Sequence, residues 1–533
     1  MELYTMHFLT IEREFMGRNL LALNVMWKYM EQDRVTTLIL VLSLLPTLVL
    51  TCCNSSEFNV LDYGAFGDGI ANDILAFVEA WNKTCNVESD DASMVVPEGM
   101  TFLVYPMAFV GPCNPTYITF LDRVTTLILV LSLLPTLVLT CCDSSEFNVL
   151  DYGAFGDGIA NDTLAFVETW NRTCNAESDD ASMVVPEGKT FLVNPMAFVG
   201  PCNPTYITFL LSGTIIAPDN PEAWKGRNLG QWLTFQDVNG LGVSGPGKID
   251  GRGQVWWDIS CKRHPQSPGC GKLAPTVLSF IECNQFSISN ILIVNSPQTH
   301  ILVTGCNNVM IDSLSIKSPE TSPNTDGIHI SHSTGVFVSN TDIGSGDDCV
   351  SIGDYTSHID ITDVNCGPGH GVSIGSLGRS GNEVRVENIN VNRVNFNKTS
   401  NGVQIKTWQV GRGHVRGVVF KNINFTDVKN PIIINQNYCD VQNACKRTKT
   451  GVEISHVRYS GTFGTSKTKV AINLDCSQAV PCTNILLDTV ELESSSPGKR
   501  VISFCNNAYG NATGVVKPNS CLLKQFGLTK MSI

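Results

Sequence analysis

Short runs of alternating apolar and polar residues recur along the second half of the chain, between Val277 and Val457. Alternation with a period of two residues is typical of β-strands, and no long stretch of helical periodicity interrupts these runs. Val, Ile, Thr and Phe dominate them, as is usual in strands. The pattern therefore predicts an all-β structure for this part of the chain.

Many of the runs contain a similar four-residue segment, in which two apolar residues flank a polar pair. The steps from one segment to the next are too short for βαβ units and right for a repeat. Stacked coils of a parallel β-helix explain such a step. Cys283 and Cys306, which are separated by one such step, are then expected to stack inside the core. The segments are 288–291, 311–314, 338–341, 361–364, 386–389 and 420–423.

A tandem copy lies upstream of this repeat. Residues 33–121 and 122–210 align without a gap and differ at only seven positions, such as Ile74 against Thr163. Coils of one solenoid diverge far more than this. The similarity therefore indicates a recent duplication, or an error in the gene sequence, rather than architecture.

Each copy opens with an apolar run that resembles the hydrophobic region of a secretory signal. If the first run is cleaved as a signal, the second could act as a stop-transfer segment. A membrane anchor is the alternative reading, but each run is only about 16 to 17 residues long and contains a proline, which is marginal for a span. We expect no stable membrane association for residues 143–533.

The copies suggest the following domain organisation. We expect 1–33 to be an extension outside any domain, 34–53 a signal-like run, 54–121 a duplicated copy of the N-terminal cap, 122–142 a second signal-like run, and 143–533 the catalytic β-helix domain.

Cysteines and glycosylation sequences indicate an oxidising compartment. The segment 143–533 has an even set of 14 cysteines, and pairs such as Cys439 with Cys445 and Cys476 with Cys482 are spaced for small disulfide loops. We therefore expect a secreted, extracellular protein. Acceptor sequences for N-glycosylation occur at Asn161, Asn171, Asn397, Asn424 and Asn511.

The net charge of the chain limits the classes of molecule that it is expected to bind. The net charge of −13 over 533 residues argues against nucleic acid. It does not exclude a polyanionic substrate, because a few Lys and Arg side chains in a cleft can reverse the potential locally.

Candidate chemistry lies inside the repeat. Asp326, Asp348 and His370 follow one another at equal steps, and Asp347 adjoins Asp348. Coils of a β-helix are separated by about 4.8 Å, so these groups would share a patch about 10 Å tall. Two neighbours in a strand point to opposite faces, so Asp347 and Asp348 require a bend, for which Gly346 is suited.

Taken singly, these residues have simpler interpretations. An aspartate at a strand end is often a turn residue, a histidine is often a hydrogen-bonded surface group, and a lysine is often only solvated. Together, in order and at coil spacing, they favour an active site. No zinc-ligand spacing, phosphate-binding loop or Ser-His-Asp arrangement occurs, so we expect neither a metal nor a redox cofactor.

Four segments in fixed order, 324–326, 346–348, 369–371 and 405–406, resemble the polygalacturonases, glycoside hydrolase family 28, most closely the plant enzymes. Flanking segments at 147–154, 249–253 and 432–438 also resemble that family. The resemblance covers about 143–533 and implies a right-handed parallel β-helix of the pectin-lyase-like type.

The resemblance also implies roles for the acidic residues. Asp347 would be the general acid, and Asp326 and Asp348 would hold and deprotonate the attacking water, which inverts the anomeric centre in one displacement. Crowded carboxylates raise one another's pKa, so one of the three can stay protonated at mildly acidic pH. His370 would form a hydrogen bond near the acid.

The same comparison implies substrate contacts. Lys406 would pair with a substrate carboxylate, and Tyr438 would contact the sugar at the cleavage point. Gln404 stands where the family has an arginine, so it keeps the hydrogen bonding and loses the charge. Asn324, which belongs to the substrate-binding set, is interpreted as a turn or ladder residue rather than a catalyst.

The expected activity is hydrolysis of α-1,4-linked galacturonan in pectin by a monomer in the cell wall. A pectate-lyase-like elimination would need calcium and an arginine base, and the Asp-Asp and His set speaks against it. The third reading is a catalytically weak wall-binding protein, because Gln404 replaces the arginine.

Overall fold

The computed structural model describes residues 55–121, apart from 88–90, 98–99 and 104–116, and residues 145–524, apart from 267–269, 272, 440–444 and 446–447. The chain divides into two compact units, Met1–Leu139 and Thr140–Ile533. The extension 1–33 and the two apolar runs, 34–53 and 122–142, lie outside the described residues. Over the described ranges, no helix combines the length and the apolar character that a membrane span requires.

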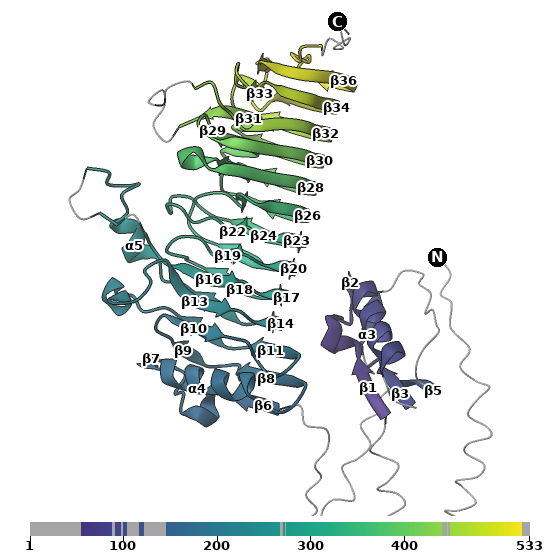
Figure 1. The fold of residues 1–533 in the computed structure, drawn as a ribbon, viewed down its shortest axis with the longest axis vertical. Coiled ribbons are helices and arrows are strands. Elements are labelled where there is room, and N and C mark those ends of the chain that lie inside the picture. Colours follow the sequence, from purple (N-terminus) through teal and green to yellow (C-terminus); the bar gives the residue numbers. More distant parts are fainter. Residues whose placement is uncertain are drawn as a thin grey trace, which may run out of the picture. The chain divides into compact units, whose positions relative to one another are not determined.

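The larger unit is a parallel β-helix, as the sequence predicts (Figure 1). Strands from successive coils pair in parallel, and one face is a sheet of 11 strands over the described ranges. This sheet carries the candidate site. Its strands are β10 (Met196–Val199), β13 (Gln231–Gln236), β16 (Thr276–Ile281), β19 (Ile301–Thr304), β22 (Ile328–Ser331), β25 (Val350–Ile352), β27 (Val372–Leu377), β29 (Asn401–Trp408), β31 (Asn430–Tyr438), β33 (Val470–Asp475) and β35 (Ile502–Asn506).

The remaining strands form a second sheet that wraps around the other faces. In the N-terminal coils two short strands follow each other in this sheet, whereas from β26 onwards one long strand spans both faces. Its strands are β6 (Ser145–Asn148), β7 (Asp157–Asn161), β8 (Asp180–Val185), β9 (Thr190–Leu192), β11 (Tyr206–Leu211), β12 (Thr214–Ile216), β14 (Asn239–Ser244), β15 (Lys248–Asp250), β17 (Asn284–Ser289), β18 (Leu292–Val294), β20 (Asn307–Asp312), β21 (Ser315–Lys317), β23 (Thr334–Ser339), β24 (Asp342–Gly344), β26 (Thr356–Cys366), β28 (Glu383–Asn397), β30 (Arg412–Val428), β32 (Glu453–Ser466), β34 (Cys482–Ser494) and β36 (Ala508–Lys517).

The coils bend where stacked residues adopt the left-handed conformation, which Asn and Asp tolerate better than most side chains. One such stack lies in the predicted segments and includes Asn290, Ser313, Asn340, Asp363 and Asn422, with φ between 47° and 58°. The bends turn the chain from one face to the next.

The register of these stacks shows that one predicted segment, 386–389, is wrong. Val391, not Val386, pairs with Ile361 on one side and Phe420 on the other. Asn388 also has the left-handed conformation, but it lies in a second bend of the coil. Its neighbour Glu387 pairs with Ser357, which precedes the Ile361 segment in the coil before. The corrected steps from 361 to 391 and from 391 to 420 are nearly equal.

Inside the coils, like residues stack on like. The free thiols of Cys283 and Cys306 are fully buried in successive coils, which confirms the prediction. The rings of Phe235 and Phe280 stack at 5.4 Å, and those of Phe280 and Phe286 at 4.2 Å. Such aromatic pairs contribute about 0.5–1.5 kcal/mol beyond their area burial. The core therefore favours one alignment of the coils.

A helix closes the N-terminal end of this β-helix (Figure 1). The helix α4 (Thr163–Cys174) buries Phe166 and Trp170 against the first coils. The Trp170 ring lies 5.2 Å from that of Phe198, and its indole N–H donates to the Val199 carbonyl at 3.2 Å. A cap of this kind covers strand edges that would otherwise pair with other chains.

Twelve of the fourteen cysteines in residues 143–533 form disulfides. The small loops closed by Cys439–Cys445 and Cys476–Cys482 are both present, as the spacing predicts. The other bonds are Cys174–Cys202, Cys261–Cys270, Cys349–Cys366 and Cys505–Cys521.

The first copy forms a small cap of its own. Its helix α3 (Ile74–Asn86) packs near the buried core residues Val60 and Met94. Its sheets, β1-β3-β5 and β2-β4, repeat the pairings β6-β8-β11 and β7-β9 of the second copy. The second copy continues from β11 to β14, whereas no further strand pairs with β5 over the described ranges. The strands are β1 (Ser55–Asn59), β2 (Asp68–Asn72), β3 (Asp91–Val95), β4 (Thr101–Leu103) and β5 (Tyr117–Leu121).

Because one solenoid has one N-terminal end, we predict that residues 1–142 are dispensable. A chain of residues 143–533 behind an unrelated secretion signal should match the full chain in activity and keep its melting temperature within about 1 °C. A chain that starts at residue 211 lacks both caps and should aggregate. A clear fall in melting temperature or in secretion for the 143–533 chain would show that the first copy is structural.

Candidate active site

The predicted acidic and basic residues lie on consecutive coils of the 11-stranded sheet. Asp326, Asp348 and His370 each lie two residues before a strand, and the strands that follow pair Ile328 with Val350 and Val350 with Val372. The three residues therefore hold equivalent places in successive coils. This is the register that their equal spacing along the chain predicts.

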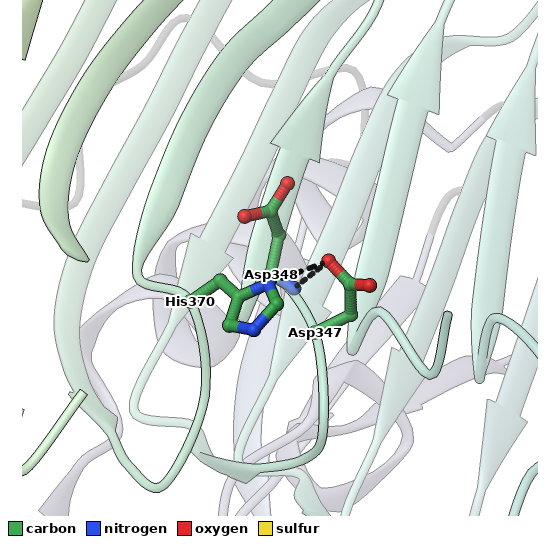
Figure 2. Close-up of side chains that lie close together, drawn as sticks. All are labelled: Asp347, Asp348 and His370. Carbon is green, nitrogen blue, oxygen red and sulfur yellow. Dashed lines mark hydrogen bonds and ion pairs between the residues drawn. The ribbon is translucent and has the colours of Figure 1, made fainter. Parts of the chain in front are cut away.

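The predicted bend between the two aspartates is present. Asp347 and Asp348 lie in the turn between β24 and β25, directly after Gly346. The Gly346 amide donates to Thr325 Oγ1 at 2.9 Å, and a Cβ on this glycine would lie 1.9 Å from the Ser322 carbonyl oxygen. Only glycine allows so close an approach. Figure 2 shows the two adjacent aspartates beside His370, with Asp347 making the contacts to the His370 ring and to the Asp348 backbone.

Asp347 binds two basic groups. His370 Nδ1 lies 3.0 Å from Asp347 Oδ1, and the Lys262 ammonium contacts Asp347 Oδ2. The backbone N–H of Asp348 also donates to Oδ1 at 3.0 Å (Figure 2). Burial raises the pKa of Asp347, but the hydrogen bond to His370 and the charge of Lys262 outweigh it. The pKa of Asp347 therefore lies below its ordinary value, and the group is a carboxylate.

Asp348 is held more rigidly and is almost fully buried. Its Oδ1 accepts hydrogen bonds from Ser373 Oγ at 2.7 Å and from Gln404 Nε2 at 3.2 Å, and its Oδ2 accepts one from Lys406 Nζ at 3.1 Å. Burial raises the pKa of Asp348 more than the charge of Lys406 lowers it, and Asp347 raises it further. Asp348 is thus a stronger base than an exposed aspartate.

Of the three aspartates, Asp326 has the surroundings that most favour a protonated carboxyl group. Its Oδ2 accepts a hydrogen bond from Ser351 Oγ at 2.6 Å, and His329 Nδ1 lies 2.7 Å from that hydroxyl. Burial raises the pKa of Asp326 well above its ordinary value, and the charges of Asp347 and Asp348 add to the effect. Burial also lowers the pKa of His329 to about 4, so this imidazole is neutral at mildly acidic pH.

His329, Ser351 and Ser373 were not predicted from the sequence. A signal for them was available, because each lies three residues after one of the stacked residues Asp326, Asp348 and His370. The strand register aligns all three with Gln404. These polar side chains form a second row that supports the carboxylates.

Gln404 and Lys406 lie on the same face of β29, because both contact Asp348. Gln404 is only 5% exposed, and its amide also contacts Ser373 Oγ. The Lys406 ammonium lies 5.9 Å from the centre of the Tyr438 ring, which follows at the end of β31. Of the predicted substrate-binding side chains, Gln404 and Lys406 thus contact Asp348, and Tyr438 lies beside Lys406.

Asn324 has φ of 57°, which is typical of a turn residue. Its Oδ1 accepts a hydrogen bond from Lys262 Nζ at 3.1 Å. Lys262 itself was not predicted, because it lies outside the repeat, after the short helix α5 (Gln254–Asp258). The two cysteines that flank its loop, nine residues apart and joined by a disulfide, were the available signal.

Three of these groups have atoms that a metal ion could use. The carboxylate oxygens of Asp347 and Asp348 and a ring nitrogen of His370 lie within 4.8 Å of one another. Lys262 and Lys406 already place ammonium groups against the two carboxylates, however, and their charge repels a cation. The arrangement instead suits proton transfer between carboxyl groups and a substrate.

Comparison with known proteins identifies the relatives of this chain. The model of glycosyl hydrolases family 28 matches residues 174–517. A polygalacturonase of Malus domestica is 43% identical over 70% of this chain and 79% of its own, and polygalacturonase-2 of Solanum lycopersicum is 40% identical over 71% and 81%.

Solved structures share the fold. The polygalacturonase of Erwinia carotovora has a TM-score of 0.54 and 20% identity, over 71% of this chain and 96% of its own. The endo-xylogalacturonan hydrolase of Aspergillus tubingensis has a TM-score of 0.57 and 23% identity, over 69% of this chain and 100% of its own.

The raised pKa of Asp326 predicts a cost in stability. The folded state holds this proton more tightly than the unfolded state, whose pKa is near 3.8, so stability falls as the pH rises above that value. Asp326→Asn removes the charge and keeps an acceptor for Ser351. We expect the melting temperature to rise by about 1–3 °C at pH 7 and to change little at pH 4.

Asp342→Asn is the matched control, because Asp342 is an exposed aspartate on β24, in the other sheet. This variant should show no such pH-dependent gain. If Asp326→Asn gains as much at pH 4 as at pH 7, ionisation of Asp326 is not the source of the cost.

Proposed function

The chain belongs to glycosyl hydrolases family 28, and we propose that it hydrolyses α-1,4-galacturonosyl linkages in pectin. The observation that carries this proposal is the set of three carboxylates, Asp326, Asp347 and Asp348, on adjacent coils beside two lysines. Hydrolysis of a glycoside needs one carboxylic acid and one carboxylate base. The site supplies both kinds of group within a single patch.

The lysines support an acidic sugar as the substrate. The protein carries a net charge of −13, yet Lys262 and Lys406 reach the same small group of side chains. Two ammonium groups at the site make the local potential favourable for a uronate. The relatives from Malus domestica and Solanum lycopersicum are polygalacturonases, which fits this substrate.

We assign the acid role to Asp347, the base role to Asp348, and the holding of the attacking water to Asp326, whose strongly raised pKa favours the protonated carboxyl group. Asp347 is the more exposed member of the adjacent pair, with 13% side-chain exposure against 4% for Asp348, so it can reach a leaving oxygen. Both oxygens of Asp348 accept hydrogen bonds from protein groups. A carboxylate held in this way is a poor nucleophile, but it can orient a water molecule.

These roles imply a single displacement with inversion. Inverting enzymes usually separate their carboxyl groups by about 6.5–9.5 Å to admit water, and retaining enzymes by about 5–5.5 Å. Asp347 and Asp348 have oxygens within 4.8 Å, which alone would suggest retention. We favour inversion because Asp326, on the preceding coil, gives the water a second partner, and because Asp348 is not free to attack.

The acid role requires a proton that Asp347 lacks in the ligand-free protein. Its pKa is held low by His370 and Lys262, although burial opposes them. Substrate binding must therefore raise it. The charged partners of Asp347 decide how this happens.

We place the protein outside the cell, in the wall, and expect it to act as a monomer without a cofactor. Six disulfides in the described part of the larger unit support an oxidising compartment. Incubation with polygalacturonate should release reducing ends without an unsaturated product. An unsaturated product would indicate a lyase, and binding without release would indicate a wall-binding protein.

Asp347→Asn should fold normally and lose hydrolysis, because an amide cannot donate the catalytic proton. General acid catalysis contributes about 10²–10⁴-fold, so the rate should fall by at least about 100-fold. Reducing-end assays on this variant and on Asp342→Asn, with melting curves for both, measure the effect. Retention of more than about a tenth of the activity would contradict the assignment of the acid.

Gln404→Arg tests the position at which the chain departs from its family. The guanidinium would add a charge-assisted bond to a substrate carboxylate, so kcat/KM on polygalacturonate should rise about tenfold or more and depend more steeply on salt. Gln404→Met, which removes the contacts to Asp348 and Ser373, is the control. If the arginine variant is no better, glutamine is neutral or suits partly esterified pectin.

A further inference from the structure

Lys262 is the basic group at the site that no sequence motif explains. Its ammonium contacts Asp347 Oδ2 and donates to Asn324 Oδ1 at 3.1 Å. It comes from a loop 85 residues before Asp347, so no repeat of the β-helix dictates this contact. The lysine thus lies directly on the carboxyl group that must donate a proton.

The described residues next to Lys262 are anchored at several points. The disulfide Cys261–Cys270 closes the loop, and the Lys262 N–H donates to Ser260 Oγ at 3.2 Å. The next residue, Arg263, donates from Nη2 to the Thr321 carbonyl at 3.2 Å. The loop is therefore tied to the segment that carries Asn324, and only the Lys262 side chain needs to move for the ammonium to change partners.

The two lysines of the site differ in how easily they can move. The Lys262 side chain is 46% exposed, whereas that of Lys406 is 17% exposed and its partner Asp348 only 4%. Exposed ion pairs are weak and exchange readily, while buried pairs are costly to break. Lys262 can leave its carboxylate for a substrate at little cost, and Lys406 cannot.

We propose that Lys262 couples the binding of an ionised uronate to the protonation of Asp347. The inference rests on the proposed function. In the ligand-free protein the ammonium neutralises the carboxylate. When galacturonan binds, the ammonium moves to a carboxylate of the substrate, and Asp347 takes up one proton from solvent. That proton then passes to the departing glycosidic oxygen, while a proton of the attacking water goes to Asp348.

The charged groups around Asp347 act on its ionisation in opposite directions, and Lys406, whose pKa the charge of Asp347 raises, is among those that favour the carboxylate. His370 and Lys262 contact Asp347 directly, and both lower its pKa against the effect of burial. The charge of Asp347 raises the pKa of Asp326 and of Asp348, so simultaneous ionisation of these neighbouring carboxyl groups is unfavourable. Once Lys262 withdraws, His370 is the remaining basic contact of Asp347, and the neighbouring carboxylates favour the protonated acid.

The proposal has a consequence for specificity. A methyl-esterified residue has no charge with which to attract Lys262, so Asp347 would remain ionised. Esterification should then lower kcat as well as raise KM. A lysine that only bound substrate would affect KM alone, because uniform binding does not change kcat.

The test compares wild type, Lys262→Met and Lys262→Arg by steady-state kinetics on polygalacturonate and on highly methyl-esterified pectin, across pH. The fall of kcat/KM on the basic side of its pH profile, its basic limb, reports the pKa of the acid in the free protein. The basic limb of kcat reports the pKa of the acid in the complex with substrate. In wild type the limb of kcat/KM should lie at lower pH than that of kcat. In Lys262→Met the two limbs should converge, and KM for polygalacturonate should rise about tenfold.

Lys262→Arg keeps the charge and should keep the separation of the two limbs. Lys467→Met is the matched control, because Lys467 forms an exposed pair with Asp427 at 2.9 Å outside the site. The inference would be overturned if the basic limbs of a folded Lys262→Met protein lay at the same pH values as those of wild type. It would also be overturned if esterification lowered kcat equally in wild type and in Lys262→Met. Absence of hydrolysis by wild type would instead overturn the proposed function.

Discussion

The hydrogen-bonded register between successive coils is the constraint on which the rest of the structure depends. Parallel strands fix the distance between coils at about 4.8 Å, so residues at equivalent places are stacked whether or not their charges attract. This register brings Asp326 and Asp348 into one site, where burial and the charge of Asp347 raise the pKa of both. Burial of these carboxylates destabilises the fold, and the packing of the core, including the stacking of Phe235 on Phe280, offsets that cost.

The sequence predicted what the repeat dictates. Asp326, Asp348 and His370 are equally spaced along the chain, and the structure stacks them accordingly. The prediction that 386–389 belongs to the repeat was wrong because both bends of a coil contain left-handed Asn residues. A local sequence pattern therefore does not show in which of the two bends a segment lies. Lys262 could not be found in this way, since its contact with Asp347 depends on a loop outside the repeat.

The pKa of Asp347 is lowered and that of Asp348 is raised because the two carboxylates differ in burial and in their charged partners. Asp348 pairs with Lys406 in a nearly buried contact, whereas Asp347 pairs with the half-exposed Lys262. The two aspartates are adjacent in sequence and follow the bend at Gly346, yet their carboxylates contact separate lysines. A single site can thereby hold a permanent base and an acid that depends on the substrate.

The stereochemistry of hydrolysis tests the central claim most directly. If Asp347 protonates the leaving oxygen while Asp326 and Asp348 activate water, one displacement converts the α-linkage into a β-hemiacetal. Proton NMR of the anomeric region, recorded during the first minutes of galacturonan cleavage, should show the β-anomer first and the α-anomer only after mutarotation. Initial appearance of the α-anomer would contradict the account, because it would require a covalent intermediate on one of these carboxylates.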